Sequence, residues 1–257
     1  MLERREAILR KVREEGRVTV AELSREMNIS EVTIRGDIRS LDQEGLLRRV
    51  RGGAVAVDRG EAAELPYPSL SQHVEEKRAI AEYADSFIED GDTIILDDAS
   101  TTYYLAQKIC EKPYRHLNVV TNCLSIAVLF WNQPNIELYM VGGSVGGNMP
   151  STVGGEAAAW IENIRVEKAF IGVHGLNLDI GLTSVASPQM LVKKAILKAA
   201  RETYVLADSS KFDNGYLSVI CPVEAVHRII TDDGITPEDR KKAENKRLPL
   251  TVVDVNR

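Results

Sequence analysis

Strand and helix patterns alternate regularly from residue 75 onward, and this alternation constrains the fold more than any other feature of the chain. The expected helices cover residues 75–89, 101–110, 124–131, 157–164, 188–200 and 237–246. The expected strands are "TIILDD", "LNVVTN", "IELYMVGG", "KAFIGV", "TYVLAD", "VHRIITD" and "LTVVDV". Because such alternation is typical of parallel strands joined by helices, the pattern predicts an α/β domain with a mostly parallel sheet.

The N-terminal residues show a different pattern, three helical segments followed by a hairpin. The first segment covers residues 3–15 and places on one face Ile8, Leu9 and Val12. At the start of the second segment, Thr19 and Glu22 have the spacing of a capping box, in which each side chain bonds the backbone N–H of the other residue.

The third helical segment is expected to begin after the N-cap residue Ser30 and to end at Gly45. Its buried stripe, at i, i+4 and i+7 spacing, is formed by Ile34, Ile38 and Leu41. The opposite face, free to meet a groove, carries Val32, Gly36, Arg39 and Gln43, flanked by Thr33 and Arg35.

The stretch "LLRRVRGGAVAV" predicts a hairpin whose tight turn is formed by Gly52 and Gly53. Its first strand carries Arg48, Arg49 and Arg51. Three short helices and a basic hairpin predict an all-α winged helix-turn-helix, whose third helix enters the major groove of DNA. The alternative is a small docking or dimerisation domain with solvated arginines.

Charge is divided unevenly along the chain. Residues 1–57 contain 12 Lys and Arg against 10 Asp and Glu, a net charge of +2, whereas residues 58–257 contain 20 against 28, a net charge of −8. Two prolines and little periodicity predict a linker over residues 58–73. We therefore expect a DNA-binding domain at 1–57 and a separate α/β domain at 74–257.

Hydropathy and cysteine content exclude other classes of protein. No stretch approaches the roughly 18 apolar residues of a membrane helix, and the charged N-terminus has no apolar signal-peptide core. The three cysteines form no CxxC pair, so neither a disulfide framework nor a zinc site is indicated. We expect a cytoplasmic protein with no membrane contact, no metal and no cofactor.

Small and polar residues follow several of the expected strands. They include Asp98, Ser100, Thr101, Thr102, Thr121, Asn122, Gly142, Gly143, His174 and Gly175. Ligands of open α/β sheets bind beyond the carboxyl ends of strands, and phosphates bind at helix N-termini. A small phosphorylated sugar or polyol is therefore the expected ligand, with Asp98 accepting from its hydroxyls and Lys211 neutralising its phosphate.

Each of these features has an alternative interpretation. "DASTT" at 98–102 is also a good helix cap without a ligand. His174 is equally compatible with a structural histidine, and Lys211 with a solvated lysine. "GGSVGG" at 142–147 is only loosely similar to a dinucleotide loop, since no clear helix follows it.

The N-terminal stretch "VTIRGDIRSLDQEGLLRRVRGGA" resembles the DNA-binding domain of the DeoR family of bacterial transcriptional regulators. One departure is Gly36, where the family pattern has arginine. From the groove-facing side of the third helix and the basic wing, we expect the DNA-binding residues to be Ser30, Thr33, Arg35, Gly36, Arg39, Arg48, Arg49 and Arg51. With no side chain at Gly36, reading falls on its neighbours, and the glycine lets the backbone approach the groove; the alternative is loss of a contact.

Later blocks, "DASTT", "VTNCLSIA", "AFIGVHGLNLDIGLTS", "VKKAI", "LADSSKF" and "IITDDG", resemble the sensor domain of the same family. That domain is similar in fold to ribose-5-phosphate isomerase and the CoA transferases, and generally senses a sugar phosphate. The expected effector contacts are Asp98, Ser100, Thr101, Thr102, Thr121, Asn122, Gly142, Gly143, Glu156, His174, Gly175 and Lys211. Departures from the family pattern are Ser100, Gln189, Met190 and His174.

The resemblance implies a repressor of a carbohydrate-metabolism operon that binds paired half-sites as a homo-oligomer and responds to a sugar phosphate. One alternative is a sugar-phosphate isomerase with a DNA-binding appendage, for which the candidate acids, bases and cation are Asp98, Glu156, Asp208 and Lys211. Another is a DNA-binding scaffold without a ligand.

Overall fold

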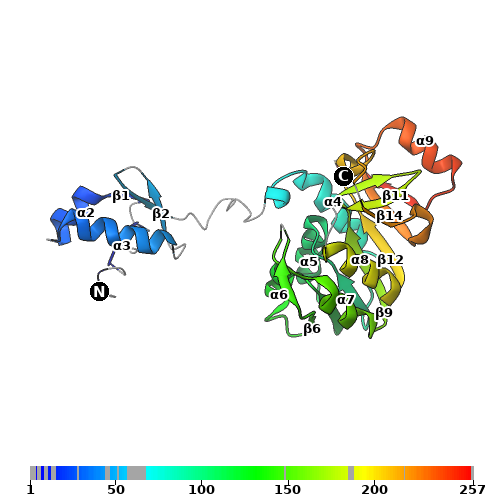
Figure 1. The fold of residues 1–257 in the computed structure, drawn as a ribbon, viewed down its shortest axis with the longest axis horizontal. Helices are drawn as coiled ribbons and strands as arrows, with labels where there is room; N and C mark the ends of the chain where they lie inside the picture. The colour runs from blue at the N-terminus through cyan, green and yellow to red at the C-terminus, as the bar shows by residue number, and fades with distance from the viewer. Residues whose placement is uncertain are drawn as a thin grey trace. The chain divides into compact units, whose positions relative to one another are not determined.

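The computed structural model divides the chain into two compact units, Met1–Glu64 and Leu65–Arg257 (Figure 1). The structure describes residues 4, 7–8, 11–12, 16–27, 29–43, 47–50, 52–56, 68–147, 149–184, 188–216 and 218–255. Each unit has its own hydrophobic core and is described by itself.

The first unit combines helices with a small antiparallel sheet. Its described helices are α2 (Val20–Met27) and α3 (Glu31–Gln43). The sheet has the order β1 (Arg17–Thr19), β3 (Gly53–Ala56), β2 (Leu47–Val50). Its core contains the predicted stripe of α3, fully buried, together with Ile8, Val12, Val18, Val20, Leu23, Leu47 and Ala54.

Both predicted helix starts of this unit are confirmed. The carboxylate of Glu22 accepts from the backbone N–H of Thr19 at 2.9 Å, and the hydroxyl of Thr19 accepts from the N–H of Glu22 at 3.2 Å. The hydroxyl of Ser30 accepts from the N–H of Thr33 at 3.3 Å. Most of the predicted helix over 3–15, including Leu9, lies outside the described residues. Gly45, the predicted end of the third helix, also lies outside them.

The sequence interpretation of the wing needs two corrections. First, the structure adds a strand, β1, that the sequence did not predict. Three residues are too few to show a periodicity, and their partner, β3, lies more than thirty residues further along the chain. Second, Gly53 is a strand residue paired with Val50 rather than part of the turn. Of the two glycines only Gly52 has a positive φ, 84°, whereas a Cβ on Gly53 would lie 2.0 Å from the carbonyl oxygen of Val18.

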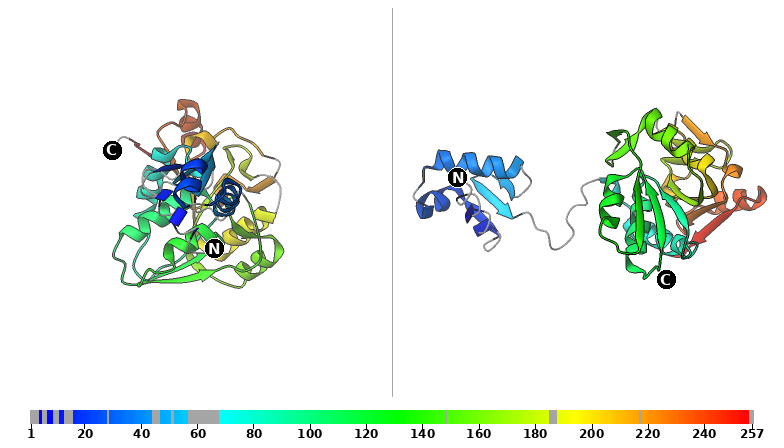
Figure 2. Two further views of the ribbon diagram at one scale, coloured as in Figure 1. Left: turned by 90° about the vertical axis from the view of Figure 1, so that its left-hand side faces the viewer. Right: turned by 90° about the horizontal axis from the view of Figure 1, so that it is seen from below.

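The second unit is built on a seven-stranded sheet whose pairings are all parallel, as predicted. Figure 2 shows these strands side by side. Their order is β15 (Leu250–Val253), β14 (Arg228–Asp232), β12 (Ala200–Leu206), β9 (Val166–Gly172), β4 (Thr93–Leu96), β5 (Leu117–Thr121), β6 (Ile136–Met140).

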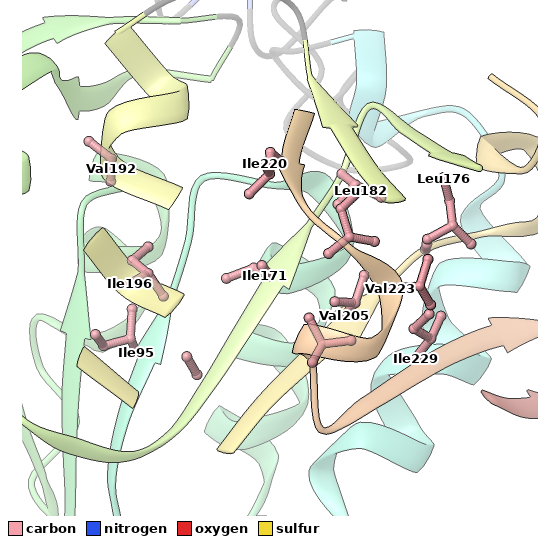
Figure 3. Packing of buried hydrophobic residues seen from close by; sticks show 14 of the residues in the cluster. Ile95, Ile171, Leu176, Leu182, Val192, Ile196, Val205, Ile220, Val223 and Ile229 are labelled. Atoms are coloured by element: carbon pink, nitrogen blue, oxygen red, sulfur yellow. The ribbon is translucent and has the colours of Figure 1, made fainter. Parts of the chain in front are cut away.

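Helices cover both faces of this sheet (Figure 1). One face packs against α4 (Val74–Asp85), α5 (Ser100–Glu111) and α6 (Leu124–Phe130). The other packs against α7 (Gly154–Glu162) and α8 (Pro188–Ala199), with α9 (Pro237–Asn245) contributing Ala243. Figure 3 shows the core on the face covered by α7 and α8, in which Ile171, Val205 and Ile229 come from neighbouring strands. None of the helices in the described part of the chain is long and apolar enough to span a membrane.

Two small antiparallel sheets were not predicted. β7 (Ser144–Gly146) pairs with β8 (Ser151–Val153), and β11 (Gly181–Ser184) lies between β10 (Gly175–Asn177) and β13 (Ser218–Cys221). These strands are only three or four residues long, so they show little hydrophobic alternation. β7–β8 and β10–β11 are short local hairpins, whereas β13 pairs with β11 from more than thirty residues further along the chain. Leu176 and Leu182 are buried against the main sheet.

The order of the strands places a crevice at the centre of the sheet. From β4 the chain proceeds to β5 and β6 on one side, and from β9 to β12, β14 and β15 on the other. The helices that follow β4 and β9 therefore diverge, and ligands of open parallel sheets bind at such a switch point. The carboxyl ends of β4 and β9 are the residues around Asp98 and His174.

Candidate functional site

In the first unit, two of the predicted arginines line one depression between α3 and the wing. Its volume is about 410 Å³, and it is lined by Val20, Arg35, Ile38, Arg49, Val50, Gly52 and Gly53. Arg35 comes from the third helix and Arg49 from the first strand of the hairpin. Two cations from a helix and a neighbouring wing can contact phosphates on either side of a groove.

The exposed face of α3 carries further predicted contacts. The hydroxyls of Ser30 and Thr33 lie 2.9 Å apart at its N-terminus. Arg35 is exposed and forms an ion pair of 2.6 Å with Glu31. A Cβ on Gly36 would meet no atom within 4 Å, so the helix has a flat, open surface there. The side chains of Arg39 and Arg48, and the whole of Arg51, lie outside the described residues.

One residue of this face was not among the predicted contacts. Val32 is 76% exposed, although it is apolar and lies in the first turn of α3. Exposed apolar side chains on a groove-facing helix can contact thymine methyl groups. The 100° geometry of the helix had already placed Val32 on the groove side, and this was the signal available in the sequence.

In the second unit, a cavity of about 160 Å³ opens at the carboxyl ends of β4 and β9. It is lined by Ser69, Asp98, Ala99, Ser100, Met149, Gly172, Val173, His174, Gln189, Lys193, Lys211 and Tyr216. Four predicted effector contacts, Asp98, Ser100, His174 and Lys211, are therefore brought together from separate elements. The cavity lies where the sheet topology changes direction.

A buried ion pair forms the floor of the cavity. Lys193, from α8, contacts the carboxylate of Asp97 and donates to the carbonyl of Gly172 at 3.0 Å. Burial lowers the pKa of Lys193, but the carboxylates of Asp97 and Asp98 outweigh it, so the net shift is upward and the ammonium stays charged. Asp97 also accepts from the N–H of Gly172 at 3.0 Å, which joins β4 to β9.

Asp98 presents a carboxylate that is held from two sides. One oxygen accepts from the hydroxyl of Ser151 at 2.8 Å and from the side-chain amide of Gln189 at 2.9 Å. The other lies 3.6 Å from the ammonium of Lys193. A carboxylate oriented in this way can accept hydrogen bonds from ligand hydroxyls.

The helix-cap alternative for "DASTT" does not describe the structure. The N-cap of α5 is Ala99, which has no side-chain oxygen, and Asp98 is directed to Ser151 and Gln189 instead. The first N–H groups of this helix thus have no side-chain cap, and Ser100 in the first turn lines the cavity. An uncapped helix N-terminus with a nearby hydroxyl is suited to bind an anion.

Lys211 and His174 lie on other walls of the same cavity. The ammonium of Lys211 is 3.9 Å from the carboxylate of Asp208 and is partly exposed. Nδ1 of His174 lies 3.0 Å from the hydroxyl of Ser184. Burial, and then the positive charge of Lys193, lower the pKa of His174, so its ring is neutral at pH 7.

The remaining predicted effector contacts do not line the cavity, and their role in binding stays a prediction. The hydroxyl of Thr102 is buried and donates within the Asp97 to Ala99 loop. Thr101 is buried on α5. Thr121 donates to the carbonyl of Leu96 at 2.7 Å, which joins β5 to β4.

Further along the chain, Asn122 is buried, and its amide donates to the carbonyl of Thr152 at 3.1 Å. Gly142 and Gly143 are exposed after β6, and Glu156 is exposed on α7. Gly175 is buried in β10, where a Cβ would lie 2.0 Å from the carbonyl oxygen of Asn214.

Sequence reasoning missed the ion pair at the floor. Lys193 and Gln189 come from α8, a helix about 90 residues beyond Asp97 and Asp98. A signal was present, because Lys193 is three residues before the buried Ile196 and so occupies the apolar stripe of its helix. A lysine in such a stripe needs a buried partner.

A winged DNA-binding unit joined to an α/β unit with a polar cavity at its switch point is the architecture of a ligand-responsive transcriptional regulator. Residues 4–60 match the family model of the DeoR-like helix-turn-helix domain, and residues 72–233 match that of the DeoR C terminal sensor domain. The chain belongs to the DeoR family of transcriptional regulators. It is accordingly a DNA-binding regulator and not an isomerase with an appended DNA-binding domain.

Individual relatives agree with this membership. The chain is 33% identical over 256 residues to the HTH-type transcriptional regulator YulB of Bacillus subtilis (strain 168), covering 99% of this chain and 98% of the relative. It is 28% identical to the lactose phosphotransferase system repressor of Staphylococcus epidermidis, covering 90% and 92%. Among solved structures, it is similar to a D-ribose-5-phosphate isomerase in complex with phospho-erythronic acid, with a TM-score of 0.40, 20% identity and coverage of 53% and 52%.

Proposed function

We propose that this chain is a cytoplasmic repressor of a carbohydrate-metabolism operon, released from its operator by a small phosphorylated sugar or polyol. The observation that carries the proposal is the composition of the cavity in the second unit. A cation, Lys211, and the uncapped N-terminus of α5 share this cavity with the oriented carboxylate of Asp98. The name of the lactose phosphotransferase system repressor, a relative over most of its length, agrees with sugar-linked control.

The chemistry of the walls defines the ligand class. A phosphate would bind between the ammonium of Lys211 and the first turn of α5, where Ser100 adds a hydroxyl. Asp98 would accept hydrogen bonds from hydroxyls on the carbon chain. The cavity volume of about 160 Å³ suits a ligand of a few carbons rather than an oligosaccharide or a dinucleotide.

We also propose a homo-oligomer bound to an operator with paired half-sites. One winged unit presents one recognition helix, α3, and two-fold protein symmetry is mirrored by two half-sites in DNA. In this arrangement the residues that contact bases or phosphates in the major groove are Ser30, Thr33, Arg35 and Arg39. Arg48, Arg49 and Arg51 contact the flanking backbone.

The test is a gel shift on the DNA upstream of the protein's own gene, repeated with a panel of sugar and polyol phosphates. One compound is expected to release the DNA from the wild-type chain. The K211Q and D98N variants should need at least about ten-fold more of that compound for release, equal to about 1.4 kcal/mol of binding energy. Without the compound, their affinity for the operator should equal that of the wild-type chain.

The matched control is K241Q, which removes an exposed lysine of α9 away from the cavity. It should respond like the wild-type chain. A K211Q variant that is released at the wild-type concentration would contradict the placement of the phosphate. A panel that leaves the wild-type shift unchanged at every concentration would contradict control by sugar phosphates.

A further inference from the structure

Exposed apolar side chains occur on β6, the last strand of the seven-stranded sheet, on α6, which packs against it, and on β7, which follows it in sequence. Tyr139 and Met140 of β6 are 41% and 36% exposed. Val128 of α6 and Trp131, just after it, are 75% and 78% exposed, and Val145 of β7 is 60% exposed. Large exposed aromatic and methionine side chains in one region are typical of protein interfaces.

The backbone of β6 is also open along this edge. β6 is the last strand of the sheet, and in the described part of the chain its outer side pairs with no strand. On its inner side the carbonyl of Asn135 accepts from Leu117 and the N–H of Val141 donates to Thr121. Because a parallel ladder uses every second residue, the N–H and C=O groups of Leu138 and Met140 point outward.

The same region is almost free of charge. Between residues 117 and 155 the only charged residue is Glu137, whereas 27% of the whole chain is charged. Residues 58–257 carry a net charge of −8, so two copies of the second unit repel one another overall. A neutral, apolar edge is where two such copies can meet without opposing like charges.

We propose that a second copy of this chain adds its own β6 antiparallel to this edge, with the two-fold axis at Leu138. The outward N–H and C=O of Leu138 would pair with those of Leu138 of the second copy. The N–H of Met140 would donate to the carbonyl of Ile136 of the second copy, while the N–H of Ile136 keeps its bond to the carbonyl of Gln133 at 3.2 Å. This inference rests on the homo-oligomer of the proposed function, and it assigns the contact between the copies to β6.

Charge complementarity favours this register. With the axis at Leu138, Glu137 faces Tyr139 of the second copy, so a carboxylate meets a phenol that can donate to it. Within one chain these groups already form such a bond, from the hydroxyl of Tyr139 to Glu137 at 2.6 Å. An axis at Glu137 would instead bring two carboxylates directly opposite each other, which is unfavourable.

The experiment measures the mass of the full chain in solution by sedimentation equilibrium. The wild-type chain should be a dimer or a larger even assembly. Y139E places two carboxylates opposite one another on each side of the axis, so its mass should fall by half. In E137K/Y139E each new carboxylate would face a new ammonium, and the wild-type mass should return.

I180E serves as the matched control, because Ile180 is 55% exposed and lies between β10 and β11, away from β6. It should keep the wild-type mass. A Y139E chain that keeps the wild-type mass, or a double variant that stays dissociated, would overturn this contact and leave the proposed homo-oligomer intact. A monomeric wild-type chain would overturn both.

Effector recognition is measured separately on Y139E, by thermal shift with the compound that releases the wild-type chain from DNA. Y139E should keep that shift, because no residue of the cavity lies on β6. If Y139E both dissociates and loses the thermal shift, the substitution perturbs the fold. That result would overturn the interface as the cause of dissociation.

Discussion

Two buried lysines of the second unit show how strongly the partner decides the state of a charge. Lys193 contacts Asp97 and Asp98, whose negative charges outweigh the cost of burial and raise its pKa. Lys77 of α4 instead donates to two backbone carbonyls, those of Ser69 at 2.5 Å and Gln72 at 2.6 Å. With carbonyl dipoles in place of a bound carboxylate, burial lowers the pKa of Lys77 to about 8.

The lowered pKa of Lys77 predicts a specific dependence of stability on pH. Between pH 8 and pH 10.5 the unfolded chain keeps a proton on Lys77 that the folded chain has released. Raising the pH through this window therefore favours the folded state. Relative to K77M, the wild-type second unit should gain about 3 kcal/mol in unfolding free energy from pH 8 to pH 10.5.

Urea unfolding followed by tryptophan fluorescence measures this difference, since both tryptophans, Trp131 and Trp160, belong to the second unit. Comparison with K77M cancels the titration of other lysines and tyrosines. Equal pH dependence of the two proteins would show that Lys77 is charged at pH 9 in the folded state.

At the scale of elements, two glycines of the first unit have opposite roles. Gly36 occupies an open helical surface, where a side chain would meet nothing. Gly53 allows β1 to pair with β3, since a Cβ there would overlap the carbonyl of Val18. The sequence shows that one glycine lies in a helix and the other in a hairpin. Whether each position tolerates a side chain depends on the atoms that pack against it.

We predict that G53A destabilises the first unit by about 1 to 3 kcal/mol, as overpacking does, because β1 must move away from β3. The matched control G36A should stabilise α3 by up to about 1 kcal/mol, the difference in helix propensity. Amide hydrogen exchange of residues 16–27 and 47–56 measures the effect of G53A, and exchange of residues 31–43 measures that of G36A. The tryptophan fluorescence of the second unit should not change, and slower exchange in G53A would refute the packing argument.

At the scale of the whole molecule, regulation requires that the cavity of the second unit and the DNA face of the first be energetically coupled. Coupling of this kind is usually worth about 1 to 3 kcal/mol and is reciprocal for binding. The two sites are built from separate units with separate cores. The homo-oligomer proposed above gives such units a way to influence the spacing of paired recognition helices.

Reciprocity leads to a quantitative prediction. If the effector lowers operator affinity by a given factor, saturating operator DNA should lower effector affinity by the same factor, between about 5 and 150. Calorimetric titration of the effector into the free chain and into the chain–operator complex measures this factor. Equal effector affinities in the two titrations would mean that DNA release has another cause.

Much of the fold could be predicted because it depends on local patterns. The parallel strands, their covering helices, the buried stripe of α3 and the caps at Thr19 and Ser30 all follow from periodicity and from hydrogen bonds over three residues. The short strands β1, β7, β8, β10, β11 and β13 could not be predicted, since three or four residues are too few to show a periodicity. In addition, β1 and β13 pair with strands more than thirty residues away in the sequence.

The sequence by itself determined the class of each unit and the residue types at the strand ends. Only the tertiary structure decided which of those residues share a cavity. Asp98, Ser100, His174 and Lys211 meet there, whereas Thr121 and Asn122 are directed to backbone carbonyls. The ion pair of Asp97 and Lys193 spans 96 residues, and no local pattern specifies such a contact, because strand order alone brings the two elements together.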